Sequence, residues 1–199
     1  MNPQILGITG GIGSGKSVVA QCLYNMNIPI YNTDNEAKRL NNTHPAIRQA
    51  LEQLIGEEIY TECGYLNKPL LASYLFENEQ YAKQINAIIH PYVEEDFLQW
   101  KQRQESPWVA IESAILYESG FDRLTDKIIT IYAPQEMRIE RASKRDHTSV
   151  DTIRQRMERQ MLDEEKRIRA AYTIINDDKH PILPQILDIL ANLLCKIPR

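Results

Sequence analysis

The 199-residue sequence is poor in cysteine and has no long apolar run, and both shortages limit what the protein can be. Its three cysteines, Cys22, Cys63 and Cys195, are odd in number and form no C-x-x-C pair. We therefore expect free thiols in a reducing compartment. No apolar run reaches the ~18 residues of a membrane span, and no signal-peptide pattern opens the chain. The cytoplasm is the expected compartment, and no membrane partner is expected.

Positive charge is scarce as well. The chain has 23 Lys and Arg against 27 Asp and Glu, a formal net charge of -4 at pH 7. A general nucleic-acid binder is usually basic, so no nucleic-acid partner is expected. The strings N-K-x-D and D-x-x-G, which a GTPase uses to bind guanine and to switch, do not occur. Nothing in the sequence indicates an obligate protein partner.

Glycine is concentrated in one place. Five of the eight glycines lie between Leu6 and Gly15, and residues 10–17 read GGIGSGKS, which fits G-x-x-x-x-G-K-[ST] at every fixed position. Such a glycine loop turns several backbone N–H groups toward one phosphate, and the helix behind it adds a positive N-terminal end. The motif therefore predicts a site for a nucleoside triphosphate with Mg²⁺. A glycine-rich turn without a ligand is the alternative.

Different residues of the glycine loop are expected to bind the phosphates and the metal. Lys16 is expected to reach the terminal phosphates, and the Ser17 hydroxyl is expected to bind the metal. The predicted phosphate-binding residues are Gly11, Gly13, Ser14, Gly15, Lys16, Ser17 and Val18.

Apolar runs of strand length predict a parallel sheet. Gln4–Thr9 and Ile28–Asn32 enclose the glycine loop and a helix over Lys16–Met26, which is the βαβ pattern. Three later runs predict further strands: Trp108–Glu112, Lys127–Ala133 and Tyr172–Asn176. The expected fold class is α/β, a parallel sheet of about five strands flanked by helices.

Helical periodicity fills the stretch between the second and third predicted strands. The expected helices are Ala46–Ile55, Lys68–Phe76, Glu79–Ile89 and Tyr92–Gln104. His90-Pro91 separates the last two, because the residue before a proline avoids helical angles. An amphipathic helix over Pro181–Lys196 is expected near the end of the chain. The predicted domains are a nucleotide-binding core (1–34, 106–137 and 171–199), a helical insert (35–105) and a helical lid (138–170).

The other parts that a small kinase needs have candidates too. Asp34 follows the second strand, at the edge where ligands bind in open parallel sheets, and its carboxylate can accept the proton of an attacking hydroxyl. The alternative is that Thr33 or Asp34 caps the next helix. Glu112, at the end of the third strand, is a candidate Mg²⁺ ligand, directly or through water. A capping or surface acid is the alternative for Glu112.

The predicted lid holds eight of the thirteen arginines. Arg141 and Arg145 lie four residues apart on one helix face, and guanidinium groups match phosphate oxygens in a bidentate way. These two are the candidates for neutralising charge on a transferred phosphate, together with Lys16. For any one arginine of the lid, a solvated helix face with i,i+4 ion pairs is the alternative.

With these residues in hand, the sequence resembles the dephospho-CoA kinase family over nearly its whole length. The matching stretches are GITGGIGSGKSVVA, IYNTDNEAKRL, ECGYLNKPLLASYLF, INAIIHPYV, ESAILYESG, RASKRD and RQRMERQ. The resemblance implies a P-loop kinase with a helical substrate-binding insert and a lid. It also implies ATP-dependent phosphorylation of the ribose 3′-hydroxyl of dephospho-CoA, the last step of coenzyme A synthesis.

The resemblance implies roles for single residues. Asp34 falls at the position of the family's catalytic base, and Lys16, Arg141 and Arg145 remain as its cationic partners. Contacts to dephospho-CoA are expected from Asp34, Lys68, His90 and Leu116, and a contact to ATP is expected from Asn176.

The sequence departs from the family pattern at several positions. Asn32 stands where an aspartate is usual, and Arg138 stands near where a glutamine is usual. Cys63, Ala114 and Ala171 also differ from the family's residues. Two other hypotheses stay open: another P-loop kinase of small molecules or nucleoside monophosphates, and a non-catalytic ATP-binding module.

Overall fold

The chain forms two compact units in the computed structural model, which describes residues 2–77 and 79–194. We call the residues up to Tyr31 and from Gln104 onward the sheet unit, and Asn32–Arg103 the helical unit. The predicted thiol Cys195 and the predicted helix end at Lys196 lie outside the described residues. The predicted lid falls within the sheet unit, and its separation as a third domain stays a prediction.

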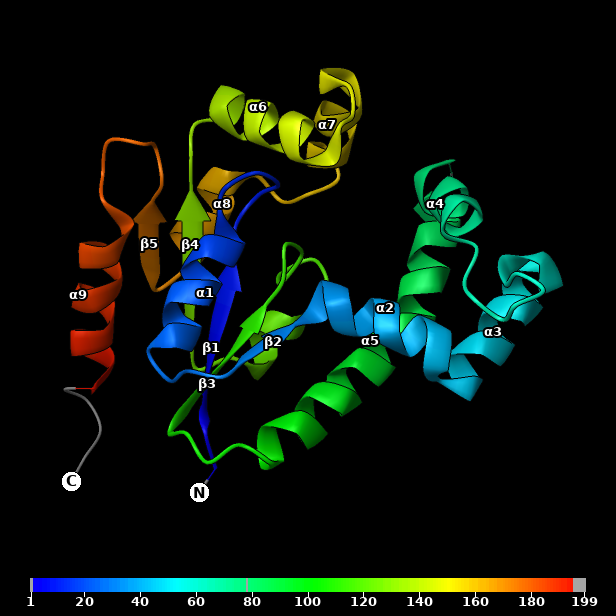
Figure 1. Ribbon diagram of the computed structural model, residues 1–199, viewed down its shortest axis with the longest axis horizontal. Coiled ribbons are helices and arrows are strands. Elements are labelled where there is room, and N and C mark those ends of the chain that lie inside the picture. Colours follow the sequence, from blue (N-terminus) through cyan, green and yellow to red (C-terminus); the bar gives the residue numbers. More distant parts are fainter. Residues whose placement is uncertain (1, 78, 195–199) are drawn as a thin grey trace. The chain divides into compact units, whose positions relative to one another are not determined.

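The sheet unit is built on a parallel sheet (Figure 1). Within the described residues the sheet has five strands: β1 (Gln4–Thr9), β2 (Ile30–Asn32), β3 (Trp108–Glu112), β4 (Lys127–Tyr132) and β5 (Tyr172–Ile175). Their order is β2-β3-β1-β4-β5. β1 pairs in parallel with β3 and β4, and β4 pairs in parallel with β5. The predicted α/β fold is confirmed, and each strand ends within two residues of its predicted bounds.

An apolar core lies on one face of the sheet. The helices α1 (Lys16–Asn25) and α9 (Ile182–Leu194) contact each other and pack against the strands (Figure 1). Alternate strand residues such as Leu6 and Ile8 point into this core, as the pleat requires, and Leu23 of α1 meets them there. Full burial of each such side chain stabilises the fold by about 1.5–3 kcal/mol. This packing fixes the position at which β1 ends and the glycine loop begins.

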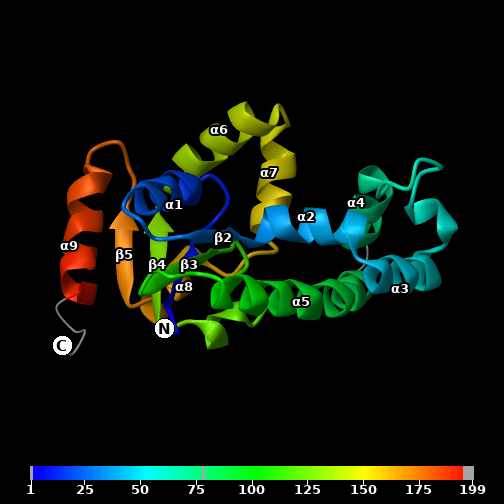
Figure 2. The same cartoon turned by 60° about the horizontal axis from the view of Figure 1, so that its bottom comes forward.

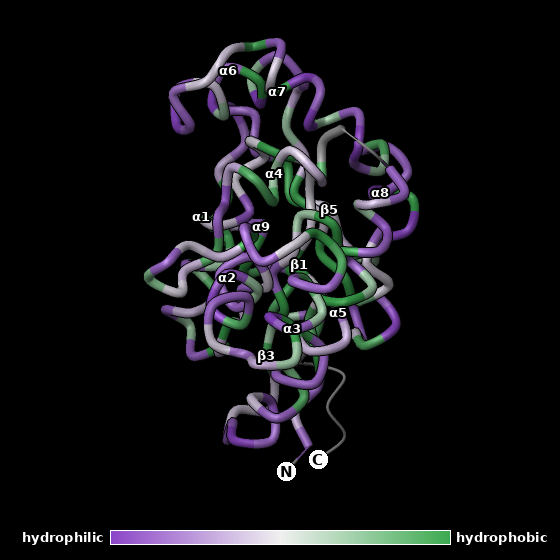
Figure 3. Tube along the Cα trace, turned by 90° about the vertical axis from the view of Figure 1, so that its right-hand side faces the viewer, coloured by the Kyte–Doolittle hydropathy of each residue, from purple (hydrophilic) through white to green (hydrophobic). Residues whose placement is uncertain are grey.

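Three charged helices follow β4 along the chain: α6 (Gln135–Asp146), α7 (Val150–Met157) and α8 (Asp163–Arg169). Figure 3 colours α6 and α7 mainly hydrophilic. These two helices contain a small apolar cluster of Ile139, Ala142 and Ile153, and Ile12 of the glycine loop packs against it. The prediction of helix through this charged stretch is confirmed.

The helical unit consists of four helices and one 3-10 turn in its described residues: α2 (Thr33–Thr43), α3 (Pro45–Ile55), η1 (Glu57–Ile59), α4 (Lys68–Glu77) and α5 (Glu79–Gln102). α5 contacts α2, α3 and α4 (Figure 2). In residues 2–77 and 79–194, no helix combines the length and the apolarity that crossing a membrane requires.

The predicted break between two helices at His90-Pro91 is wrong, because α5 runs through Pro91 without ending. Pro91 removes one helical hydrogen bond. However, an apolar stripe continues across it at four-residue spacing, formed by Ile85, Ile89, Val93 and Phe97. Burial of this stripe against the neighbouring helices outweighs the local cost of the proline.

Candidate functional site

β1 leads directly into the glycine loop, Gly10–Ser17. Gly13 and Gly15 have φ angles of 77° and 95°, in the left-handed region that glycine adopts without strain. Space excludes side chains there as well. A Cβ on Gly13 would collide with the backbone of Arg138, and a Cβ on Gly15 would collide with the side-chain amide of Asn176. The segments that follow β4 and β5 therefore close around the loop, and the fixed glycines follow from that crowding.

α1 begins at Lys16 with its positive end at the loop. Among the described residues no side chain caps this helix, and its first turn contains no acid, so the end is suited to an anion. Lys16 Nζ donates to the carbonyl oxygens of Gly10 and Gly11 at 2.9 and 3.3 Å. The ammonium group thus lies along the loop, where the phosphates of a bound nucleotide would meet it.

Ser17 and Glu112 come together at the carboxyl ends of β1 and β3. Glu112 is in register with Ile8 of β1 and is 6% exposed. Ser17 Oγ donates to Glu112 Oε1 at 3.1 Å. A hydroxyl and a carboxylate are oxygen donors of the kind that Mg²⁺ prefers. Since no group of three His, Cys, Asp or Glu is placed for a metal in the described part of the chain, this pair could hold one only together with phosphate and water.

Asn176, just after β5, connects the glycine loop to α6. Its backbone N–H donates to the Tyr132 carbonyl, and its Nδ2 donates to the Ser14 carbonyl, both at 2.8 Å. Arg141 Nη1 donates to the Asn176 carbonyl at 3.0 Å, and Nη2 pairs with Asp178 at 2.6 Å. The structure thus brings two predicted site residues, Asn176 and Arg141, to the edge of the loop.

Arg145 has different surroundings from Arg141, although the two share a helix. Its side chain is 64% exposed and pairs with the adjacent Asp146 at 2.7 Å. Asp146 also pairs with Arg156 of α7, and these contacts lower the pKa of its carboxyl. Arg145 is therefore part of a surface ion-pair group, whereas Arg141 is tied to the segment after β5.

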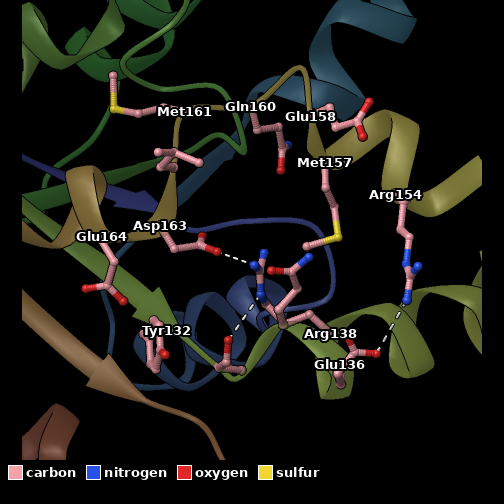
Figure 4. A pocket seen from close by; sticks show the side chains of 13 residues that line it. Tyr132, Glu136, Arg138, Arg154, Met157, Glu158, Gln160, Met161, Asp163 and Glu164 are labelled. Carbon is pink, nitrogen blue, oxygen red and sulfur yellow. Dashed lines mark hydrogen bonds and ion pairs between the residues drawn. The ribbon is translucent and has the colours of Figure 1, made fainter.

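A cavity of about 570 Å³ lies beside the loop, within the sheet unit. Figure 4 shows its walls, which come from the end of β4, from α6 and α7, and from the segment leading into α8. Arg138, 5% exposed, lies in this wall, donates from Nε to the Ala133 carbonyl at 3.1 Å and forms an ion pair with Asp163. Gln160 also lines the cavity, and its Oε1 accepts the Ile12 N–H at 3.0 Å. Polar groups of the predicted lid segment thus reach the loop itself.

Three predicted site residues belong to the helical unit and lie on three different helices. Asp34 is exposed in the first turn of α2, and Lys68 is exposed at the start of α4. His90 is partly buried within α5, and this burial lowers the pKa of its imidazole, so the ring is mainly neutral at pH 7.

The similarity of the chain to known proteins covers almost its whole length. The sequence profile of the dephospho-CoA kinase family matches residues 4–181. The chain belongs to the dephospho-CoA kinase family. A dephospho-CoA kinase of Bacteroides fragilis is 51% identical over 193 residues, 96% of this chain and 94% of that protein. The family accounts for the glycine loop as part of an enzyme of the P-loop kinase class, which uses a phosphate donor and acts on small molecules.

Solved structures agree with this family at the level of the fold. The crystal structure of TT1252 from Thermus thermophilus is 30% identical and superposes with a TM-score of 0.84 over 100% of both chains. The dephospho-CoA kinase from Campylobacter jejuni is 19% identical and superposes with a TM-score of 0.68, covering 95% of this chain and 96% of that one.

Asn32, where dephospho-CoA kinases usually have an aspartate, is the N-cap of α2. Its Oδ1 accepts the N–H of Asn35 at 2.9 Å. The hypothesis that Thr33 or Asp34 caps this helix is therefore wrong. Asparagine and aspartate are about equally good caps, so the departure keeps the cap and removes one negative charge. The carboxylate of Asp34 is left in the first turn without the capping role.

Leu116 is placed in the core rather than at a surface. Its side chain is 0% exposed, and it lies against β1 at Gly7, where an added Cβ would approach Leu116 to 2.8 Å. In this conformation Leu116 offers no surface to a ligand. The predicted contact of Leu116 with the substrate of a dephospho-CoA kinase stays a prediction.

Sequence reasoning missed Lys166, which lies in α8 with its side chain fully buried. Its Nζ donates to the Ala114 carbonyl at 2.7 Å and pairs with Glu118 at 3.0 Å. Glu118 Oε1 also accepts the Met161 N–H at 2.7 Å. The sequence does not indicate this burial, since a lysine is usually exposed and an isoleucine is usually buried. In α8 the charged Lys166 is buried and the apolar Ile168 is 84% exposed. In this member of the family, Lys166 joins the predicted lid to the loop after β3.

Proposed function

We propose that the protein transfers the terminal phosphate of ATP to the ribose 3′-hydroxyl of dephospho-CoA, giving CoA and ADP. The observation that carries the proposal is the Ser17–Glu112 contact at the end of a complete glycine loop. Membership of the dephospho-CoA kinase family supports the choice of acceptor. The closeness of Asn176 and Arg141 to the loop supports a nucleotide as the donor.

The proposed chemistry is an in-line displacement at the terminal phosphorus. The 3′-oxygen forms a bond to phosphorus, the bond to the oxygen bridging the β- and γ-phosphates breaks, and the hydroxyl proton passes to the Asp34 carboxylate. Lys16, Arg141 and Arg145 neutralise the charge that spreads over the transferred group. Orientation of the two substrates supplies much of the remaining rate enhancement.

Ser17 and Glu112 are the proposed residues for Mg²⁺. Their two oxygens, 3.1 Å apart, suit a small hard cation whose other positions are filled by phosphate oxygens and water. When bound with ATP, Mg²⁺ supplies neutralisation of the phosphate charge. Ser17 is the direct ligand in this proposal, and the buried Glu112 orients Ser17 or binds through water.

The acceptor contacts proposed in the helical unit are Asp34, Lys68 and His90. Asp34 and Lys68 are exposed and accessible. His90 is mainly neutral at pH 7, so it is suited to hydrogen bonding in a pocket wall rather than to charge neutralisation. The cysteine usage of the sequence supports the cytoplasm as the proposed compartment.

Acceptor-dependent ADP release tests the proposal. The purified protein, with Mg²⁺ and ATP, is offered dephospho-CoA, AMP, CMP and shikimate in separate reactions. We expect release of ADP with dephospho-CoA well above the rate without an acceptor. Activity with a nucleoside monophosphate alone would assign the protein to a different kinase specificity. Tight ATP binding with no acceptor-dependent release would favour a non-catalytic module.

A further inference from the structure

Ile12, in the middle of the glycine loop, is held by the predicted lid segment in three ways. Its N–H donates to Gln160 Oε1 at 3.0 Å. Its carbonyl oxygen accepts a longer hydrogen bond of 3.5 Å from Arg138 Nη1. Its side chain packs against the apolar cluster of Ile139, Ala142 and Ile153 on α6 and α7. The donor, the acceptor and the side chain of one loop residue therefore all contact the same segment.

Arg138, the first of the two holding groups, is itself fixed. It is 5% exposed, its Nε is bonded to the Ala133 carbonyl, and it forms an ion pair with Asp163 (Figure 4). A Cβ on Gly11 would collide with its guanidinium group. The Arg138 side chain therefore has one position, against the loop.

Gln160, the second holding group, is braced through its neighbours in sequence. Its own N–H donates to the Met157 carbonyl at 3.0 Å. The next N–H along the chain, that of Met161, donates to Glu118, which pairs with the fully buried Lys166. These contacts hold the side-chain amide of Gln160 against the glycine loop. The fully buried Lys166 takes part in them through its ion pair with Glu118.

The two contacts fall on the two peptide groups that join Ile12 to Gly11 and to Gly13, residues of the proposed phosphate cradle. Because each of these peptide groups adjoins a glycine, the backbone has little conformational restraint of its own. Contacts that fix both peptide groups therefore select the loop geometry in which neighbouring N–H groups meet a phosphate. The same contacts transmit stiffening of the loop by a bound nucleotide to the segment that holds it.

We propose that Gln160 and Arg138 are positioning residues, which act through the backbone N–H and C=O of Ile12 to couple the predicted lid segment to the glycine loop. Nucleotide binding then orders α7, and the ordered segment in turn favours nucleotide binding, as reciprocity requires. This inference rests on the proposed function for its kinetic consequences, but its binding consequences need only a nucleotide in the loop.

The variant that tests the coupling is Gln160→Met, which keeps the length of the side chain and removes the acceptor oxygen. Gln155→Met is the matched control, because Gln155 is exposed on α7 in the same segment. Gln160→Glu restores an acceptor oxygen at the same distance. Gln160→Asn withdraws the amide by one methylene and decides the outcome if Gln160→Met does not fold.

The measurements are the affinity for Mg·ADP by calorimetry and amide hydrogen exchange of residues 147–160 with and without Mg·ADP. For Gln160→Met and Gln160→Asn we expect about 3–10-fold weaker ADP binding, as for loss of one hydrogen bond. The protection that Mg·ADP gives to α7 should also be lost. Gln160→Glu should keep that protection, and Gln155→Met should match the wild type in both measurements.

The kinetic arm separates positioning from a general structural role. We expect the KM for ATP to rise several-fold in Gln160→Met, with kcat changed less than about twofold, because Gln160 touches no reacting atom in the proposal. Wild-type ADP affinity together with wild-type protection of α7 in that variant would overturn the inference. If the wild type shows no acceptor-dependent ADP release, the proposed function fails, while the binding and exchange arms still test the coupling.

Discussion

In the sheet unit the candidate residues are held by their neighbours, whereas in the helical unit Asp34 and Lys68 are exposed at the starts of helices. Ser17 is bonded to Glu112, and Asn176 links Ser14 to Arg141. The contrast indicates two kinds of site. Substitutions in the sheet unit change side chains that are hydrogen-bonded to one another, while substitutions of Asp34 and Lys68 remove one exposed side chain and leave the packing intact.

The largest effect is expected from Asp34→Asn, which tests the claim that an exposed side chain of the helical unit carries chemistry. We expect turnover to fall by roughly 10²-fold or more, because the variant cannot accept the hydroxyl proton. The affinity for Mg·ADP and the thermal stability should stay at wild-type values. Steady-state ADP release and calorimetry measure these quantities.

Glu36→Gln is the matched control for Asp34→Asn. Glu36 lies in the same first turn of α2 and pairs with Arg39 at the surface. Loss of this pair should leave turnover within about twofold of the wild type, since surface ion pairs contribute little. Normal turnover in Asp34→Asn, or an equal loss in Glu36→Gln, would remove the special role of Asp34.

Ser17→Ala tests the connected geometry of the sheet unit. Removal of the hydroxyl should raise the Mg²⁺ concentration needed for half-maximal activity by about 10–100-fold. A titration of activity against Mg²⁺ at saturating ATP measures the shift. Ser106→Ala, whose hydroxyl bonds to the Asn27 carbonyl, is the control and should leave the titration unchanged. An unshifted titration in Ser17→Ala would mean that Ser17 is not a metal ligand.

Arg141→Met and Arg145→Met sharpen the comparison within one helix. Arg141 anchors the segment of Asn176 and Asp178, so its loss should raise the KM for ATP by about 10-fold. Arg145 is bonded to Asp146 and not to the segment after β5, so its loss should change that KM less, and should lower turnover through its proposed contact with the transferred phosphate. A larger rise in the KM for ATP in Arg145→Met than in Arg141→Met would reverse this assignment.

The smallest expected effect is the pH dependence that His90, in the helical unit, gives to the melting temperature. Burial lowers the pKa of His90 below its usual value of 6.5. The folded state therefore binds a proton on His90 more weakly than the unfolded state does. The free energy of unfolding thus keeps the full contribution of neutral His90 above pH 6.5 and loses this contribution as the pH falls below that value. Melting temperatures of His90→Asn should fall less between pH 7 and pH 5 than those of the wild type. The exposed His147→Asn should behave like the wild type.

The parts of the fold that the sequence predicts correctly are those with a local cause. The glycine loop is specified by residues at fixed spacing, and the strands are specified by short β-branched runs between turns. The prediction that Ser17 and Glu112 both bind the metal stays a prediction, but the positions of the two residues follow from the sequence, which places Ser17 directly after the glycine loop and Glu112 at the end of a strand. The structure brings these two side chains within hydrogen-bonding distance.

The parts that the sequence does not reveal depend on distant partners. The continuity of α5 through Pro91 comes from packing on three other helices. The burial of Lys166 depends on Ala114 and Glu118, about fifty residues earlier in the chain. Arg138 departs from the family pattern in the sequence, and its contact with the glycine loop arises only from the tertiary fold. No local pattern encodes such pairings.

The product of the reaction tests the central claim most directly. After incubation with Mg²⁺, ATP and dephospho-CoA, mass spectrometry and phosphorus NMR identify where phosphate has been added. We expect one added phosphate, on the ribose 3′-oxygen, formed by the wild type and formed at most about 1% as fast by Asp34→Asn. A phosphate at any other position, or unchanged dephospho-CoA with ATP bound, would contradict the account.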